Sequence, residues 1–299
     1  MFDFLRGGKA TAAITVDRSL QPYYYAGETV RARVELQVQR ELTITEARAQ
    51  LVCREKYQYR DQSRDIDEDG SAHSSIEKKW ATHEQVVQQR RLLPEGTLPN
   101  GWGQAFDFVA PIPADAPPTC PNGKIVNVEW FVKATLARKL ARDIEAQLPI
   151  QLLSAPTGAA AGEGEYGFSN EPDEATLSFA LPSVEWCLGD TAQGTFVVRP
   201  QKGFDVSEVR LELVRQEHVS RGKGNTFRET KPVKLAGRTR LQPGQELAIP
   251  FRVTIPETAP VTLRAHYSTV TWSLVGILAR PLRRDTYIEQ ELFVFSRRR

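Results

Sequence analysis

The chain has 299 residues, of which 40% are hydrophobic and 25% charged, and its formal net charge is +2. These values are ordinary for a globular protein and exclude the disordered and collagenous classes, and the length suffices for two domains that each bury a core. The longest apolar runs have the length of a strand, far below the about 20 residues of a spanning helix, so we expect no transmembrane segment.

The first clear element is a strand from Thr29 to Val38, which follows a turn at Gly27-Glu28. Hydrophobic residues alternate along it with charged or polar ones, at Val30, Ala32, Val34, Leu36 and Val38. A period of two is the pattern of a half-buried strand, whereas a helix would place the intervening charges in its core.

A charged segment, about Tyr57 to His83, follows the next strand and is expected to be a loop of the first domain. We consider it a candidate partner-binding loop, with the charged residues Arg60, Asp61, Arg64, Asp65, Asp67, Glu68 and Asp69. The alternative is a solvated hairpin extension, because exposed charge runs usually only keep a surface soluble. Acidic residues also alternate from Asp65 to Gly70, but Ile76 stands where a calcium loop needs a bidentate glutamate, so no metal is expected.

A later strand places apolar residues on one face, at Val126, Val128, Trp130, Val132, Ala134 and Leu136. Its counterpart in the second half places Val270, Trp272, Leu274 and Leu278 on one face. Both tryptophans are therefore expected in a core. Prolines such as Pro113 and Pro256 follow the strands before these and are expected to end them, since proline removes a ladder donor.

An internal repeat relates the two halves, and it determines the expected architecture. The segment from Thr45 to Glu55 recurs from Ser207 to Glu217, at the same offset as the turn Gly27-Glu28, which recurs as Gly189-Asp190. Further matched pairs follow in order: Phe108 to Pro113 with Phe251 to Pro256, Val128 to Trp130 with Val270 to Trp272, and Ala137 to Asp143 with Ala279 to Asp285. Matched blocks in one order indicate a duplication of a strand-rich domain.

Between the copies, residues 154–174 hold several glycines and alanines, five acidic residues and no Lys or Arg, which is typical of a linker. Gly162 to Gly167 matches G-x-G-x-x-G, but acidic residues at the variable positions and the linker context argue against a dinucleotide site. We therefore predict an all-β chain of two tandem antiparallel, immunoglobulin-like β-sandwich domains at 1–153 and 175–299, joined by an acidic linker at 154–174.

At these blocks the chain resembles the arrestin-like superfamily, especially the bacterial and archaeal sporulation-control proteins. The resemblance rests on Ala13 to Asp17, Tyr25 to Val30, the strand around Leu51 to Cys53, Phe106 to Pro113, Val128 to Ala134 and their repeats in the second copy. It implies two sandwiches that act as a scaffold or adaptor. It supplies no binding residues, because neither the buried salt-bridge network of visual arrestins nor a Pro-Pro-x-Tyr motif is found in this sequence.

The resemblance implies a non-enzymatic cytoplasmic adaptor that binds protein partners without a cofactor. Two alternatives stay open: a small-ligand or carbohydrate-binding sandwich pair, which an exposed row of aromatics would favour, and a hydrolase with distributed catalytic residues. The four histidines are not at metal-ligand spacing, and no Gly-x-Ser-x-Gly or Gly-Lys-Ser/Thr signature is present. Trp80, Trp102 and Trp186 are candidate binding aromatics, although packing explains each equally well or better.

Charge and cysteine usage complete the sequence-based expectations. The second copy carries the excess of Lys and Arg, but these residues are dispersed and lack interleaved aromatics, so no nucleic acid is expected and peripheral contact with an anionic membrane stays open. Met1 to Lys9 does not resemble a secretory signal. Cys53, Cys120 and Cys187 are odd in number and widely spaced, as in a reducing compartment, and we expect packing or surface thiols.

Overall fold

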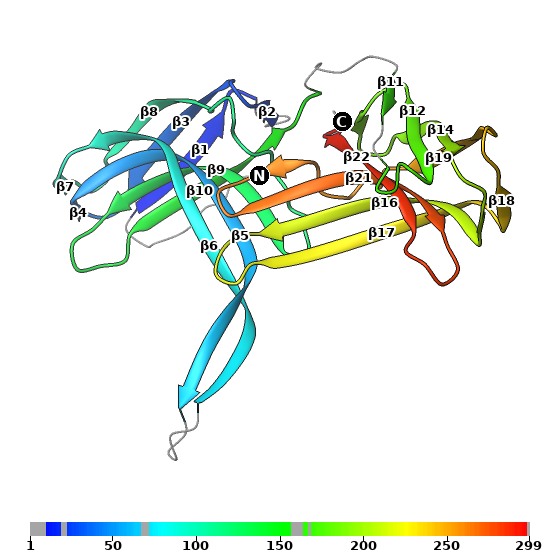
Figure 1. Cartoon of the computed structure of the whole chain (residues 1–299). Helices are drawn as coiled ribbons and strands as arrows, with labels where there is room; N and C mark the ends of the chain where they lie inside the picture. The colour runs from blue at the N-terminus through cyan, green and yellow to red at the C-terminus, as the bar shows by residue number, and fades with distance from the viewer. Residues whose placement is uncertain (1–9, 19–22, 67–71, 157–163, 167–168, 298–299) are drawn as a thin grey trace. The chain divides into compact units, whose positions relative to one another are not determined.

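The computed structural model describes residues 10–18, 23–66, 72–156, 164–166 and 169–297, and for 63–66, 72–74 and 164–166 it describes the backbone alone (Figure 1). All regular elements in these ranges are β-strands, which confirms the all-β prediction. The chain divides into two compact units. Unit 1 comprises Met1–Tyr57, Trp80–Pro121 and Asn127–Ser154, and unit 2 comprises Gln58–Lys79, Asn122–Val126 and Ala155–Arg299.

The N-terminal half forms the first sandwich from two sheets and a short ribbon. The smaller sheet has the order β1 (Ala10–Val16), β3 (Thr29–Val38), β8 (Gly103–Pro111). The larger sheet has the order β2 (Tyr23–Tyr25), β10 (Ile144–Leu153), β9 (Val126–Ala137), β5 (Glu46–Ile66), β6 (Ala72–Leu93). The ribbon pairs β4 (Leu42–Ile44) with β7 (Gly96–Leu98).

The C-terminal half repeats this arrangement. Its smaller sheet has the order β11 (Gly164–Tyr166), β12 (Ala175–Leu181), β14 (Thr191–Pro200), β19 (Leu247–Thr254). Its larger sheet has the order β13 (Glu185–Cys187), β22 (Thr286–Phe295), β21 (Ser268–Ala279), β16 (Glu208–Val219), β17 (Asn225–Ala236), and β20 (Leu263–Arg264) also pairs with β21. The ribbon pairs β15 (Phe204–Val206) with β18 (Thr239–Leu241).

The two larger sheets have equivalent strand orders, which confirms the predicted duplication. Each begins with a short strand that runs parallel to its neighbour, β2 beside β10 and β13 beside β22, while the other recorded strand pairs are antiparallel. Trp130 on β9 and Trp272 on β21 occupy the same place, with 2% and 3% exposure. Their indole N–H groups donate to the carbonyls of Pro117 at 2.8 Å and Pro260 at 3.0 Å.

The turn before β3 is repeated before β14 with the same stereochemistry. Gly27 and Gly189 have φ values of +84° and +82°, a conformation that glycine adopts without steric cost. The following carboxylate accepts a backbone N–H within each turn, Glu28 from Tyr25 at 2.9 Å and Asp190 from Cys187 at 3.1 Å. The acid therefore closes the turn, which explains why Gly-Glu and Gly-Asp recur at the repeat.

The prediction of a loop at 57–83 is wrong for most of this segment, because strand β5 continues to Ile66 and strand β6 begins at Ala72. The segment is a long β-hairpin extension, the alternative that the charge pattern also allowed. Two neighbouring strands satisfy each other's backbone groups, so a ribbon tolerates charged residues on both faces.

The linker also contains a strand, since β11 pairs antiparallel with Phe179 to Leu181 of β12. Residues 164–166 of the G-x-G-x-x-G match are thus extended and join a sheet edge, while Gly162, Glu163 and Gly167 lie outside the described residues. A dinucleotide-binding motif needs a turn that opens a helix, whereas residues 164–166 of the linker form a strand.

Candidate interaction surfaces

The base of the β5–β6 hairpin is held within unit 2 by hydrogen bonds of its backbone groups to backbone and side-chain partners. The N–H of Gln58 donates to the carbonyl of Ile125 at 2.9 Å, and the Asn225 side chain donates to the carbonyl of Gln58 at 3.0 Å. The N–H of Lys223 donates to the carbonyl of Arg60 at 3.0 Å. The hairpin therefore leaves its sheet from a fixed base.

The β16–β17 turn beside this base requires glycine. Gly222 has a φ of +62°, and a Cβ atom there would lie 2.8 Å from the Arg60 carbonyl oxygen and 2.9 Å from the Tyr59 ring. The Arg221 guanidinium lies over the rings of Tyr59 and Tyr267, at 5.3 and 5.5 Å from their centroids. Close backbone approach and these ring contacts together fix the hairpin base against the turn.

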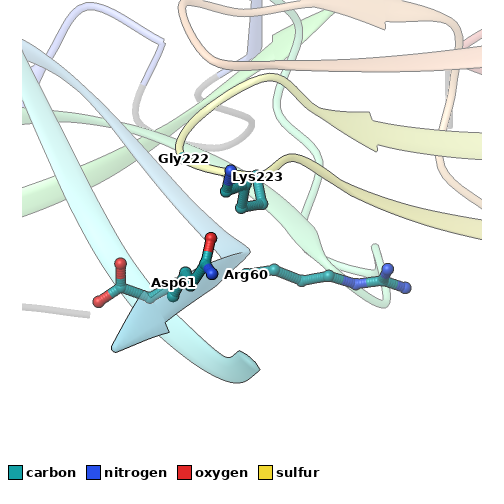
Figure 2. Close-up of a pocket in the computed structure, with 5 residues that line it drawn as sticks. Arg60, Asp61, Gly222 and Lys223 are labelled. Carbon is teal, nitrogen blue, oxygen red and sulfur yellow. The ribbon is translucent and has the colours of Figure 1, made fainter. Parts of the chain in front are cut away.

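An open pocket of about 470 Å³ lies at this contact, lined by Arg60, Asp61, Gln62, Gly222 and Lys223 (Figure 2). The side chains of Arg60 and Asp61 point away from each other in Figure 2, as expected for neighbours on a strand. The pocket thus presents backbone and mixed charge rather than a deep apolar cavity.

Asp61 and Lys79 form an ion pair across the hairpin, 2.9 Å between carboxylate and ammonium. The hydrogen bond from Lys79 lowers the pKa of Asp61, and the same bond raises the pKa of Lys79. Because both groups are exposed, the pair contributes little to stability. The two charges are therefore available to exchange partners.

The structure places only part of the predicted partner-binding loop. Arg60 and Asp61 lie on β5 at the pocket. Arg64 and Asp65 lie near the end of β5, where only the backbone is described. Asp67, Glu68 and Asp69 lie outside the described residues.

Strand β6 carries exposed apolar side chains that could contact a partner. Trp80 is 53% exposed and Val86 49% exposed, and their even spacing puts them on one face of the strand. Ile76, also on β6, is 64% exposed. Of the tryptophans identified from the sequence, Trp102 and Trp186 are half-buried, so Trp80 is the most accessible of the three.

Unit 2 contains a buried cluster of charged residues that was not predicted from the sequence. The Glu217 carboxylate is fully buried on β16 and accepts the backbone N–H groups of Lys124 at 3.0 Å and Ile125 at 2.8 Å. The guanidinium of Arg215, 4% exposed, lies 3.5 Å from Glu217 and 3.0 Å from Glu229. These contacts fix the 122–126 segment to β16.

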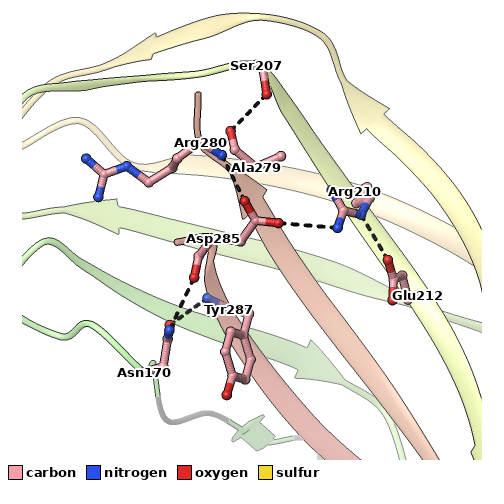
Figure 3. A network of polar contacts seen from close by, with 8 residues as sticks. All are labelled: Asn170, Ser207, Arg210, Glu212, Ala279, Arg280, Asp285 and Tyr287. Carbon is pink, nitrogen blue, oxygen red and sulfur yellow. Dashed lines mark hydrogen bonds and ion pairs between the residues drawn. The ribbon is translucent and has the colours of Figure 1, made fainter. Parts of the chain in front are cut away.

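A second polar network holds the β21–β22 turn (Figure 3). The Asp285 carboxylate accepts the N–H of Arg280 at 3.0 Å and contacts the Arg210 guanidinium at 3.4 Å. The Asn170 side chain donates to the carbonyl of Asp285 at 3.2 Å and accepts the N–H of Tyr287 at 2.7 Å. The segment after the linker is thereby tied to β22, and the turn has a defined shape.

The three cysteines are free thiols, and their burial predicts unequal reactivity. Cys53 and Cys120 are buried, and burial raises the pKa of Cys53 to about 12, so almost none of this thiol ionises near neutral pH. Cys187 is only half-buried.

We expect the native protein to be alkylated rapidly at Cys187 alone, and Cys187→Ser to abolish the rapid phase of alkylation measured by mass spectrometry. Equal rates at all three thiols would contradict the burial pattern.

Within the described residues, no group of His, Cys, Asp and Glu is arranged to hold a metal ion. No helix in the described part of the chain has the length and apolarity to cross a membrane.

Comparison with known families gives one match in each half. Residues 12–155 match the family model described as arrestin (or S-antigen), N-terminal domain. Residues 173–278 match the family model described as SpoOM protein. No curated protein matches the chain.

Proposed function

Because the chain belongs to the arrestin-like superfamily, with a sporulation-control domain in its second half, we propose that it is a non-enzymatic cytoplasmic adaptor that binds protein partners. Domains of this kind are generally non-catalytic, which supports an interaction role over an enzymatic one. The partners are proteins that dock on the exposed strands and loops of the sandwiches.

The observation that carries this proposal is the β5–β6 hairpin. Its base is fixed by Gln58 and Arg60, its charged side chains at Asp61 and Lys79 are exposed, and its strand β6 displays Trp80. A ribbon of this kind adds little to the core, so folding alone does not explain its length. Trp80 follows Lys79 on β6, so its ring lies on the face of the ribbon opposite to the ion pair. An exposed, rigid aromatic ring suits a protein contact, because tryptophan buries a large area at low entropic cost.

The carbohydrate-binding alternative lacks the observation that would favour it. Among the described residues, the large exposed aromatic side chains are Trp80 on β6 and Tyr287 on β22, on strands of different sheets. They do not form a row on one face. The adaptor function is therefore the better supported of the two.

Trimming the hairpin tests the proposal. Replacing residues 64–76 with an Asn-Gly turn keeps the fixed base at Arg60 and the ion pair of Asp61 with Lys79, and Asn-Gly is the preferred two-residue hairpin connection. We expect the melting temperature to stay nearly unchanged, because a shorter exposed loop costs little to close. The change removes five charged residues of the predicted partner-binding loop and the exposed Ile76, while Trp80 stays in place. We therefore expect partners captured from the native cytoplasm by the unchanged protein to be lost or strongly reduced.

A point variant and a matched control sharpen this test. Trp80→Ala should weaken capture, whereas Gln88→Ala, an exposed change on the same face of β6, should not. Retention of every partner at unchanged affinity by both the trimmed protein and Trp80→Ala would exclude the hairpin as the binding site.

A further inference from the structure

Strand β6 forms a free edge of the larger sheet in the N-terminal half. The strand order ends at β6, whose recorded neighbour within the described residues is β5 alone. The strand runs over 22 residues and contains no proline. An edge presents unpaired N–H and C=O groups to any extended chain, and proteins protect their edges with short strands or prolines, among other devices. Strand β6 has neither of these two, so its edge is open to pairing with a further strand.

One face of β6 is exposed along most of the strand. Side chains of even number are exposed from Ile76 to Arg90, whereas Ala81, His83 and Val87 on the other face are half-buried. The exposed face carries this row of side chains: Ile76, Lys78, Trp80, Thr82, Glu84 and Val86. Apolar and charged groups thus alternate along one accessible face.

This row is complementary to itself when two copies of β6 run antiparallel. With Ala81 opposite its own counterpart, the cross-strand pairs on the exposed face are Ile76 with Val86, Lys78 with Glu84, and Trp80 with Thr82. Each pair occurs twice about a two-fold axis, and the two indole rings lie at diagonal positions. Pairs of opposite charge and aromatic side chains at such positions stabilise a sheet.

Neighbouring registers lose this match. A shift of the pairing by two residues places Ile76 opposite Glu84 in one direction and Lys78 opposite Val86 in the other. Both charged groups can also take a new partner. Lys78 makes no ion pair among the described residues, and Glu84 binds Arg54 at 2.7 Å through one oxygen but stays 42% exposed. The charges therefore favour the register centred on Ala81.

We propose that β6 binds a second copy of this chain, and that two hairpins pair antiparallel about a two-fold axis at Ala81 into a β5–β6–β6–β5 sheet. The backbone groups of each edge then pair with those of the other copy, and the exposed side chains of Ile76 and Trp80 lose contact with water. A contact of this length is small, so we expect a reversible dimer with a dissociation constant in about the micromolar range. The proposal rests on the proposed function in that it assigns an occupant to the same hairpin.

Sedimentation of the purified full chain tests the proposal through its charges. We expect a monomer–dimer equilibrium that Lys78→Glu or Glu84→Lys weakens by about tenfold or more, because each variant alone creates two pairs of like charge. An equimolar mixture of the two variants should restore the dimer, since glutamate then faces lysine in both pairs. Arg91→Glu makes the same charge change as Lys78→Glu at an exposed position of β6 outside the paired segment, and should leave the dimer unchanged.

Disulfide trapping tests the register. In a Cys187→Ser background the two remaining cysteines are buried, so an introduced thiol is the accessible one. Ala81→Cys places two thiols directly opposite each other, at a Cα separation of about 4.5 to 5.5 Å that a disulfide can bridge. This variant should form a covalent dimer on oxidation, whereas Glu77→Cys should form one only when it is mixed with Gln85→Cys.

Failure of this proposal and failure of the adaptor function give different results. A purified protein that stays monomeric at about 0.1 mM would overturn the pairing of β6, and its capture of cytoplasmic proteins would leave the adaptor function standing. A dimer that captures no other protein would overturn the adaptor function alone. A dimer that Lys78→Glu does not weaken and Ala81→Cys does not link would place the contact elsewhere and overturn the proposal.

Discussion

Replacing Trp272 with alanine is expected to lower the free energy of unfolding by about 3 to 5 kcal/mol. The side chain is 3% exposed on β21, which lies between β22 and β16 in the larger sheet of the C-terminal half. Truncation removes its apolar contacts and leaves a cavity, and it also leaves the carbonyl of Pro260 without the indole donor. The effect thus combines packing with a lost hydrogen bond.

The duplication supplies a matched experiment at Trp130. This residue is equally buried on the equivalent strand β9 and donates to Pro117, so its truncation should cost a similar amount. Chemical denaturation of both variants measures the loss, and Trp→Phe at each site separates the two contributions because phenylalanine fills much of the volume without the donor. A cost below about 1 kcal/mol at either site would show that the indole is not a core element.

The sequence was sufficient for the fold because its strands are half-buried. In β3 the alternation of Val30, Val34 and Val38 with Arg31, Arg33 and Gln37 survives in the structure as alternating buried and exposed side chains. The repeat then placed Trp130 and Trp272 on equivalent strands without any knowledge of their partners. Local periodicity and duplication are both readable along one chain, so they predict the two sandwiches.

For the β5–β6 hairpin, the sequence pattern does not distinguish a loop from a pair of strands. Charged residues from Tyr57 to His83 suit a loop and a solvated ribbon equally well, because neither buries them. The difference lies in backbone pairing of β5 with β6 and in the fixing of Arg60 by the Gly222 turn, more than 100 residues away in the sequence. Such long-range contacts leave little trace in composition, and the assignment of a loop was wrong for that reason.

The sequence of β16 does contain a signal of the buried charged cluster. Val209, Leu211 and Leu213 define the inward face of the strand, and Arg215 and Glu217 continue it at the same spacing of two. A charged residue at an inward position is a candidate for a buried, paired group, since an isolated buried charge costs much free energy. What the sequence could not give is the partner, because Lys124 and Ile125 lie in a distant loop.

Truncating the buried acid, Glu217→Ala, is therefore expected to destabilise the protein by about 3 to 5 kcal/mol. The carboxylate is fully buried, and its removal leaves the N–H groups of Lys124 and Ile125 without their acceptor and the Arg215 guanidinium without one of its two carboxylates. Arg215 retains Glu229, which is half exposed and therefore a weaker partner. The loss should fall mainly on unit 2, which contains all these groups.

Two further variants separate the charge of Glu217 from its hydrogen bonds. Glu217→Gln keeps one acceptor oxygen for the backbone N–H groups but removes the negative charge, so it should cost less than alanine. Glu217→Leu with Arg215→Leu removes both charges and keeps apolar volume, a change that is often neutral for an isolated buried ion pair. Here it leaves the N–H of Ile125 buried and without an acceptor, so we expect it to remain destabilising by about 1 to 3 kcal/mol. Chemical denaturation of the three variants measures the series, and a double leucine variant as stable as the unchanged protein would show that the two backbone hydrogen bonds contribute nothing to the fold.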